Sequence, residues 1–122
     1  MPDALVIDDN RQTADFVCQM IKLLGVKARP AYGPREGLLL LKDRTPSIIF
    51  LDLQMPGLDG FEILSFLRRE PRLKEIPVVI VTSDDQPETA QKARRTGALL
   101  TLVKPVTIET LERVLRTVKL IA

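Results

Sequence analysis

The chain has 122 residues, and its 18 basic and 16 acidic side chains leave a net charge of +2. This length predicts one domain with a single core, covering residues 1–122. Because the chain has no histidine and one cysteine, it cannot form a Ser-His-Asp triad, a histidine phosphotransfer site, a Cys/His zinc site or an internal disulfide, so any chemistry must use carboxylates, hydroxyls and lysines.

Short β-branched or leucine-rich runs alternate along the chain with longer segments of helical period. This alternation predicts a parallel sheet covered by helices on both faces, in the α/β class. Strands are expected at residues 4–7, 27–32, 47–51, 77–81 and 99–103. The runs at 47–51 and 77–81 are apolar enough to be central strands. Pro30 lacks the N–H that a strand ladder needs, so the run at 27–32 belongs at a sheet edge.

The first two helices are expected at residues 11–24 and 34–44. The first has an apolar face made of Phe16, Val17, Met20, Ile21 and Leu24. Cys18 falls off this face and is expected to be inert. The second helix contains Gly37, which costs about 1 kcal/mol relative to alanine and therefore suggests close packing.

Capping residues mark the starts of the remaining helices. Asp59 and Glu62 have capping-box spacing and predict the start of the third helix, as Asp85 and Glu88 do for the fourth. Thr107 is expected to cap the last helix, whose apolar residues recur at spacings of three and four.

Polar side chains follow four of the five predicted strands. They are Asp8 and Asp9 after the first strand, Asp52 after the third, Thr82 and Ser83 after the fourth, and Lys104 after the fifth. Open parallel sheets bind ligands outside the carboxyl ends of their strands, so these groups should converge. Each pair of carboxylates at ~5 Å costs about 3 kcal/mol at an effective dielectric constant of about 20. The oxygen-only cluster therefore predicts a hard cation, Mg²⁺ before Ca²⁺ or Zn²⁺.

Four short segments at these strand ends identify a family when they are taken together and in order. They are Val6-Ile7-Asp8-Asp9, the run FLDLQMPGLDG at 50–60, Val81-Thr82-Ser83 and Val103-Lys104-Pro105. With them the chain resembles a bacterial response-regulator receiver domain of two-component systems along essentially its whole length. The resemblance implies a flavodoxin-like, doubly wound α/β fold with five helices and five parallel strands in the order 2-1-3-4-5. That order makes the second strand an edge, as Pro30 requires.

The resemblance also implies the chemistry of the site. Asp52 would accept a phosphoryl group from a sensor histidine kinase or a histidine phosphotransfer protein. Thr82 would donate a hydrogen bond to the acyl phosphate, Lys104 would pair with it, and the peptide bond before Pro105 would be cis. A phosphoryl group in transfer needs positioning and charge neutralisation more than proton shuttling, and these groups are suited to both tasks.

The resemblance further implies a Mg²⁺ site built by the same acidic cluster. Asp9 and Asp52 would bind the ion directly, together with the backbone carbonyl of Gln54, and Asp8 would bind it through a water molecule. One residue departs from the family pattern. Many members carry an aromatic ring or histidine in the fifth strand, three residues before the lysine, and here that residue is Thr101. A short side chain cannot sweep the volume of a ring, so the usual ring switch is in doubt.

Alternative interpretations remain open at this point. Asp9 and Gln12 have capping-box spacing, so Asp9 could merely cap the first helix. A haloacid-dehalogenase-like phosphatase would also use an aspartate at a strand end, but it needs a second aspartate where this chain has Gln54. A receiver-like module that only binds partners, without phosphorylation, is the other alternative.

The expected protein is a signalling phosphoacceptor that assists only its own phosphorylation and dephosphorylation, and not an enzyme. Its basic residues form no long block, so no direct contact with nucleic acid is expected. Charged residues interrupt every apolar run, and Met1-Pro2-Asp3 has no basic start of a signal peptide. We therefore expect a cytoplasmic protein without membrane contact, whose output goes to an unknown downstream protein.

Overall fold

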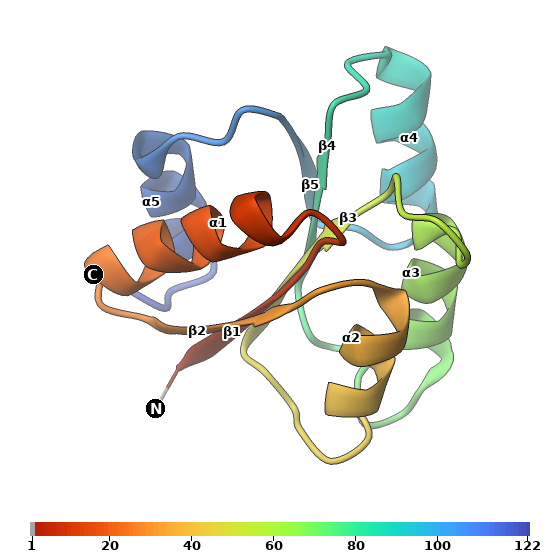
Figure 1. The fold of residues 1–122 in the computed structure, drawn as a ribbon, viewed down its shortest axis with the longest axis horizontal. Coiled ribbons are helices and arrows are strands. Elements are labelled where there is room, and N and C mark those ends of the chain that lie inside the picture. Colours follow the sequence, from red (N-terminus) through yellow and green to blue (C-terminus); the bar gives the residue numbers. More distant parts are fainter. Residues whose placement is uncertain (1) are drawn as a thin grey trace.

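The computed structural model describes residues 2–122, and Met1, the first residue of the N-terminal segment considered above, lies outside the described residues. Strands and helices alternate along the chain (Figure 1). The strands are β1 (Asp3–Ile7), β2 (Lys27–Ala31), β3 (Ile48–Asp52), β4 (Val78–Thr82) and β5 (Leu100–Val103). The helices are α1 (Arg11–Leu23), α2 (Pro34–Leu40), α3 (Gly60–Arg69), α4 (Pro87–Thr96) and α5 (Ile108–Thr117).

All strands pair in parallel, in the order β2-β1-β3-β4-β5. This confirms the predicted flavodoxin-like topology and places β2, with Pro30, at an edge. The ladder pairs Asp52 with Val81 and Thr82 with Val103. Both polar residues are therefore the last residues of their strands, whereas the sequence predicted them just beyond the strands.

Alternation of side chains along the strands divides the core into two layers. Residues such as Val6 and Phe50 face α1 and α5, while their neighbours Ile7 and Leu51 face α2, α3 and α4. Figure 1 shows the two groups of helices on opposite faces of the sheet. Every residue of β3 and β4 is buried, as predicted for central strands. The sheet is thus a rigid support for the groups at its carboxyl edge. None of the helices within residues 2–122 is both long and apolar enough to cross a membrane.

Two of the predicted helix caps are confirmed. The Asp59 side chain accepts a hydrogen bond from the N–H of Phe61 at 2.9 Å and begins α3. Thr107 accepts one from the N–H of Thr110 at 3.2 Å and begins α5. In both cases a side-chain oxygen satisfies an N–H that has no partner within the helix.

The predicted cap of α4 is wrong, because Gln86 and not Asp85 is the N-cap. Pro87 occupies the first helical position, where its fixed φ suits the helix and its missing N–H costs nothing. The helix therefore begins two residues after Asp85. The side chain that satisfies the N–H of Gln86 is that of Asp84, at 2.9 Å.

The predicted apolar face of α1 is partly wrong. Phe16 has 58% of its surface exposed, whereas Cys18 is 2% exposed. The helix is rotated so that Ala14, Cys18 and Ile21 face the sheet and α5. Burial raises the pKa of the Cys18 thiol to about 11, so the expectation of an inert cysteine fits its surroundings.

Helix α2 ends at Leu40, earlier than the predicted residue 44. The Arg72 guanidinium donates to the backbone carbonyls of Leu41, Lys42 and Arg44, which draws these carbonyls away from helical pairing. Inside the helix, Gly37 is buried and packs closely, as predicted.

Candidate functional site

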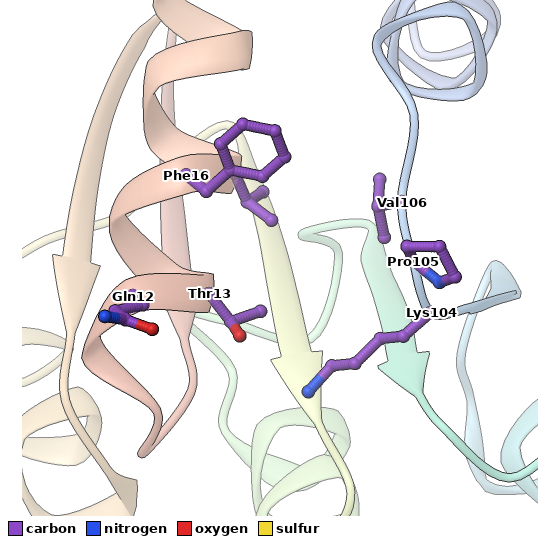
Figure 2. Close-up of a pocket in the computed structure, with 7 residues that line it drawn as sticks. Gln12, Thr13, Phe16, Lys104, Pro105 and Val106 are labelled. Carbon is purple, nitrogen blue, oxygen red and sulfur yellow. The ribbon is translucent and has the colours of Figure 1, made fainter.

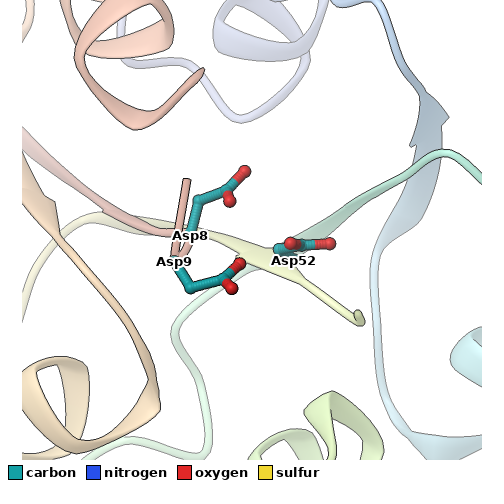
Figure 3. Close-up of side chains that lie close together, drawn as sticks. All are labelled: Asp8, Asp9 and Asp52. Atoms are coloured by element: carbon teal, nitrogen blue, oxygen red, sulfur yellow. The ribbon is translucent and has the colours of Figure 1, made fainter. Parts of the chain in front are cut away.

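Three aspartates from two adjacent strand ends form an acidic cluster. Asp8 and Asp9 follow β1, and Asp52 ends β3. One carboxylate oxygen from each residue lies within 4.8 Å of the others. Figure 3 shows the side chains of Asp8 and Asp9 extending toward the end of β3, where Asp52 lies. The predicted convergence of the carboxylates is therefore observed.

Backbone pairing explains why these residues meet. In the register of β1 and β3, Ile7 lies beside Leu51, so the next residues, Asp8 and Asp52, also come next to each other at the carboxyl edge of the sheet. Asp8 is also held by its N–H, which donates to the carbonyl of Ala31 at 3.0 Å. The same edge continues through β4 and β5. There, Thr82 is fully buried and its carbonyl accepts the N–H of Lys104 at 2.8 Å.

The Lys104 ammonium group lies between two of the carboxylates. Its Nζ is 3.0 Å from Oδ2 of Asp8 and 3.6 Å from Oδ2 of Asp52. The shorter distance makes Asp8 its main partner. Lys104 therefore lies close to Asp52, but the Asp52 carboxylate can still accept a further positively charged partner. The peptide bond between Lys104 and Pro105 is cis, as the resemblance implied.

Asp8 and Asp9 differ in what already surrounds them. The second oxygen of Asp8 accepts the N–H of Asn10 at 2.9 Å, so both of its oxygens are engaged, and its side chain is 4% exposed. Asp9 is exposed, and within residues 2–122 its carboxylate has no hydrogen bond or ion pair. The N-cap of α1 is Asn10, which accepts the N–H of Thr13 at 3.0 Å. The alternative that Asp9 merely caps this helix is thus wrong.

The Asp52 carboxylate is buried and carries a perturbed pKa. Burial raises this pKa from 3.8 to about 6, against the opposing hydrogen bond from the N–H of Gln54 at 3.1 Å. The negative charge of Asp8 raises the pKa further, and the positive charge of Lys104 lowers it. The surroundings of Asp52 therefore destabilise its ionised form, and any added positive charge nearby would stabilise it.

The charges and donor atoms of the cluster suit a divalent cation. Three carboxylates and one ammonium group leave two negative charges within a small, largely buried volume. Carboxylate oxygens are the ligands that Mg²⁺ prefers. The carboxylate of Asp9, exposed and without a partner in the described part of the chain, offers a ligand at the open side of the cluster. The residues present therefore fit a Mg²⁺ ion.

A hydrogen-bonded loop follows Thr82. The N–H of Asp84 donates to Oγ1 of Thr82 at 3.2 Å. The Asp84 carboxylate accepts the N–H of Gln86 at 2.9 Å and the hydroxyl of Thr89 at 2.6 Å. These hydrogen bonds, chiefly that of Thr89, lower the pKa of Asp84. Sequence reasoning missed Thr89, although the spacing of Asp84 and Gln86 is a signal for the turn.

A groove adjoins the site beside Lys104, between α1 and the segment that follows β5 (Figure 2). Its volume is about 560 Å³, and it is lined by Gln12, Thr13, Phe16, Val17, Lys104, Pro105 and Val106. Figure 2 shows Phe16 on one side of the groove and Pro105 and Val106 on the other. The exposed ring of Phe16, which sequence periodicity assigned to the core, therefore lines a surface next to the acidic cluster.

Comparisons with known proteins agree with this geometry. The family model for the response regulator receiver domain matches residues 4–116. The chain is 31% identical to PilH of Pseudomonas aeruginosa over 118 residues, which cover 97% of this chain and 98% of that protein. The structure of chemotaxis protein CheY4 of Vibrio cholerae matches with a TM-score of 0.89 and 30% identity, covering 97% and 98% of the two chains. A signal receiver domain of a DNA-binding response regulator from Colwellia psychrerythraea matches with a TM-score of 0.92 and 27% identity, covering 99% and 100%.

Proposed function

Because the chain belongs to the response regulator receiver family, it is a phosphoacceptor domain of two-component signalling, and we propose that Asp52 is the residue that accepts the phosphoryl group. One observation carries this assignment. The buried carboxylate of Asp52 lies beside two further carboxylates and within 3.6 Å of an ammonium group, at the carboxyl edge of the sheet. We also propose that residues 1–122 form a single receiver domain.

In the proposed reaction, an Asp52 oxygen attacks the phosphorus of a phosphohistidine. An oxygen–phosphorus bond forms, the phosphorus–nitrogen bond breaks, and the imidazole nitrogen keeps the electron pair. Ionised Asp52 is the reactive form, and at neutral pH a pKa of about 6 leaves most of it ionised. Lys104 exchanges part of its contact with Asp8 for the phosphoryl oxygens. Thr82 donates its hydroxyl to the acyl phosphate.

We propose that Asp9 and Asp52 bind Mg²⁺ directly, with the backbone carbonyl of Gln54, and that Asp8 binds it through a water molecule. The different surroundings of the two aspartates support this division. Both oxygens of Asp8 are already engaged, by Lys104 and by the N–H of Asn10. The Asp9 carboxylate is exposed and has no partner among residues 2–122, so it can turn toward an ion. When bound, Mg²⁺ supplies positive charge against the equatorial phosphoryl oxygens.

Receiver domains interact with histidine kinases or histidine phosphotransfer proteins. We propose that the phosphodonor places its histidine on a helix, and that this helix packs in the groove between α1 and Pro105. The groove opens beside Lys104, so a histidine on a helix seated there would face the acidic cluster. The exposed ring of Phe16 supplies apolar contact area. The output partner is proposed to be a protein and not a nucleic acid.

The rival functions fit the site less well. A haloacid-dehalogenase-like phosphatase needs a second carboxylate two residues after the nucleophile, but Gln54 stands there and its side chain is exposed. A receiver that only binds partners would have no use for a buried aspartate with a raised pKa beside two further carboxylates. We therefore propose a signalling domain that promotes only its own phosphorylation and dephosphorylation, without turning over an external substrate.

The test is phosphorylation by acetyl phosphate with Mg²⁺, followed by intact-mass spectrometry. The wild type should gain one phosphoryl group, and Asp52→Asn should gain none. Asp43→Asn, at an exposed position before β3, is the matched control and should behave as the wild type. Undiminished labelling of Asp52→Asn would overturn the assignment.

A further inference from the structure

A chain of hydrogen bonds connects the buried hydroxyl of Thr82 to the first turn of α4. The N–H of Asp84 donates to Thr82 Oγ1 at 3.2 Å, and the Asp84 carboxylate accepts the hydroxyl of Thr89 at 2.6 Å. The other carboxylate oxygen accepts the N–H of Gln86, the N-cap of the helix, at 2.9 Å. Asp84 is thus held by its backbone to Thr82 and by its side chain to α4.

The two ends of this chain differ in strength. The bonds that the Asp84 carboxylate accepts involve an ionised group, which makes them about twice as strong as a bond between neutral partners. The bond from the N–H of Asp84 to Thr82 is between neutral groups and is long. A displacement at Thr82 should therefore leave Asp84, Gln86 and Thr89 attached to one another. The loop and the first turn of α4 should respond as one body.

Helix α4 is held loosely enough to respond. Within α4, all of whose residues are described, Ala93 is the single buried residue. Charged or polar side chains make up most of its remaining surface. A further contact is the Lys92 ammonium, 4.2 Å above the ring of Phe61 in α3. Few buried apolar contacts mean a low free-energy cost for local movement.

At position 101, strand β5 has no large side chain that could transmit a change at the site to the surface instead. Thr101 is half-buried on β5 and, within residues 2–122, its hydroxyl has no hydrogen bond. Its short side chain cannot fill or vacate the volume of an aromatic ring. Within residues 2–122, the hydrogen bond at the Thr82 hydroxyl is the one from the N–H of Asp84.

We propose that Asp84 and Thr89 form a relay that transmits phosphorylation from Thr82 to helix α4, with Thr89 as the positioning residue on the helix. This inference rests on the proposed function, because Thr82 is taken to turn toward the acyl phosphate of Asp52. As the Thr82 hydroxyl moves, the N–H of Asp84 follows its acceptor. The Asp84 carboxylate moves with its backbone and carries the Thr89 hydroxyl with it.

The test uses Thr89→Val, which removes the hydroxyl but keeps the shape of the side chain. Thr89→Ser restores the hydroxyl, and Thr96→Val is the matched control. Within residues 2–122, the Thr96 hydroxyl bonds only to the carbonyl of Lys92, in the same helix, at 2.7 Å. Amide chemical shifts are recorded for each protein in Mg²⁺ with and without beryllofluoride, a mimic of the phosphoryl group. Labelling of each variant by acetyl phosphate is measured in parallel.

In the wild type, the mimic should shift amide signals in the 83–86 loop and in the first two turns of α4. In Thr89→Val the loop signals should still shift, the helix signals should not, and labelling should be unchanged. Thr89→Ser and Thr96→Val should keep the full response. A full response of α4 in Thr89→Val would overturn the relay while leaving the proposed function intact. Absence of labelling in the wild type would overturn the proposed function and the relay with it.

Discussion

Replacing Asp52 by asparagine should stabilise the metal-free protein. Burial and the charge of Asp8 raise the pKa of Asp52 from 3.8 to about 6, so its ionised form favours the unfolded state. This pKa difference corresponds to about 3 kcal/mol of free energy by which folding disfavours the ionised form relative to the protonated form. The asparagine side chain would keep an oxygen for the N–H of Gln54, but its amide group would face the Lys104 ammonium. We therefore expect a smaller gain, about 1 kcal/mol, in the free energy of unfolding near neutral pH.

The same group predicts how stability depends on pH. The folded protein binds the Asp52 proton more tightly than the unfolded chain, so the contribution of this residue to stability is greatest below pH 3.8 and is lost as the pH rises through about 6. Lowering the pH from about 7.5 to about 5 should therefore stabilise the wild type by about 1 kcal/mol relative to Asp52→Asn.

Urea unfolding in EDTA at both pH values measures these differences. Asp43→Asn, an exposed position before β3, controls for the general effect of removing one negative charge and should change stability little. A lower stability of Asp52→Asn than of the wild type near neutral pH would show that ionised Asp52 does not destabilise the fold. The same dependence on pH in the two proteins would show it as well.

Three further predictions concern the metal, the helix packing and the fifth strand. Asp9→Ala should weaken Mg²⁺ binding more than Asp8→Ala, because Asp9 is proposed as a direct ligand; titration calorimetry would contradict this by showing equal losses. Gly37→Ala should lower the free energy of unfolding by about 1 kcal/mol, because overpacking outweighs the gain in helix propensity. The added Cβ would lie 2.8 Å from Cδ1 of buried Ile7. An unchanged urea midpoint would contradict this prediction, because it would show that the core accommodates the extra methyl group without loss of stability. Thr101→Ala should leave the rate of labelling by acetyl phosphate unchanged, since its hydroxyl has no hydrogen bond within residues 2–122; a slower rate would show that Thr101 supports the site.

The acidic cluster could be predicted because parallel strands place their carboxyl ends at one edge. The position of Asp8, Asp9 and Asp52 after apolar runs therefore implied their proximity from the sequence alone. Their individual surroundings could not be predicted in this way. Which aspartate pairs with Lys104, and which stays exposed, depends on side-chain geometry that strand order does not specify.

Errors in the helices have identifiable physical causes. Hydrophobic periodicity weighted Phe16 above Cys18, but the rotation of α1 is set by packing against the sheet and α5. The end of α2 depends on Arg72, which is 28 residues beyond Arg44, one of the residues whose carbonyl it binds. The start of α4 depends on Pro87, whose position was a usable signal. Long-range contacts therefore limited the prediction of α1 and α2, whereas the start of α4 had a local signal.

The central claim is that Asp52 carries the phosphoryl group, and locating the modified residue tests it most directly. Protein labelled with acetyl phosphate and Mg²⁺ can be reduced with borohydride, which converts an aspartyl phosphate to homoserine and releases phosphate. Peptide mass spectrometry should then find homoserine at position 52 and unmodified aspartate at positions 8 and 9. Homoserine at position 8 or 9, with aspartate retained at 52, would contradict the account.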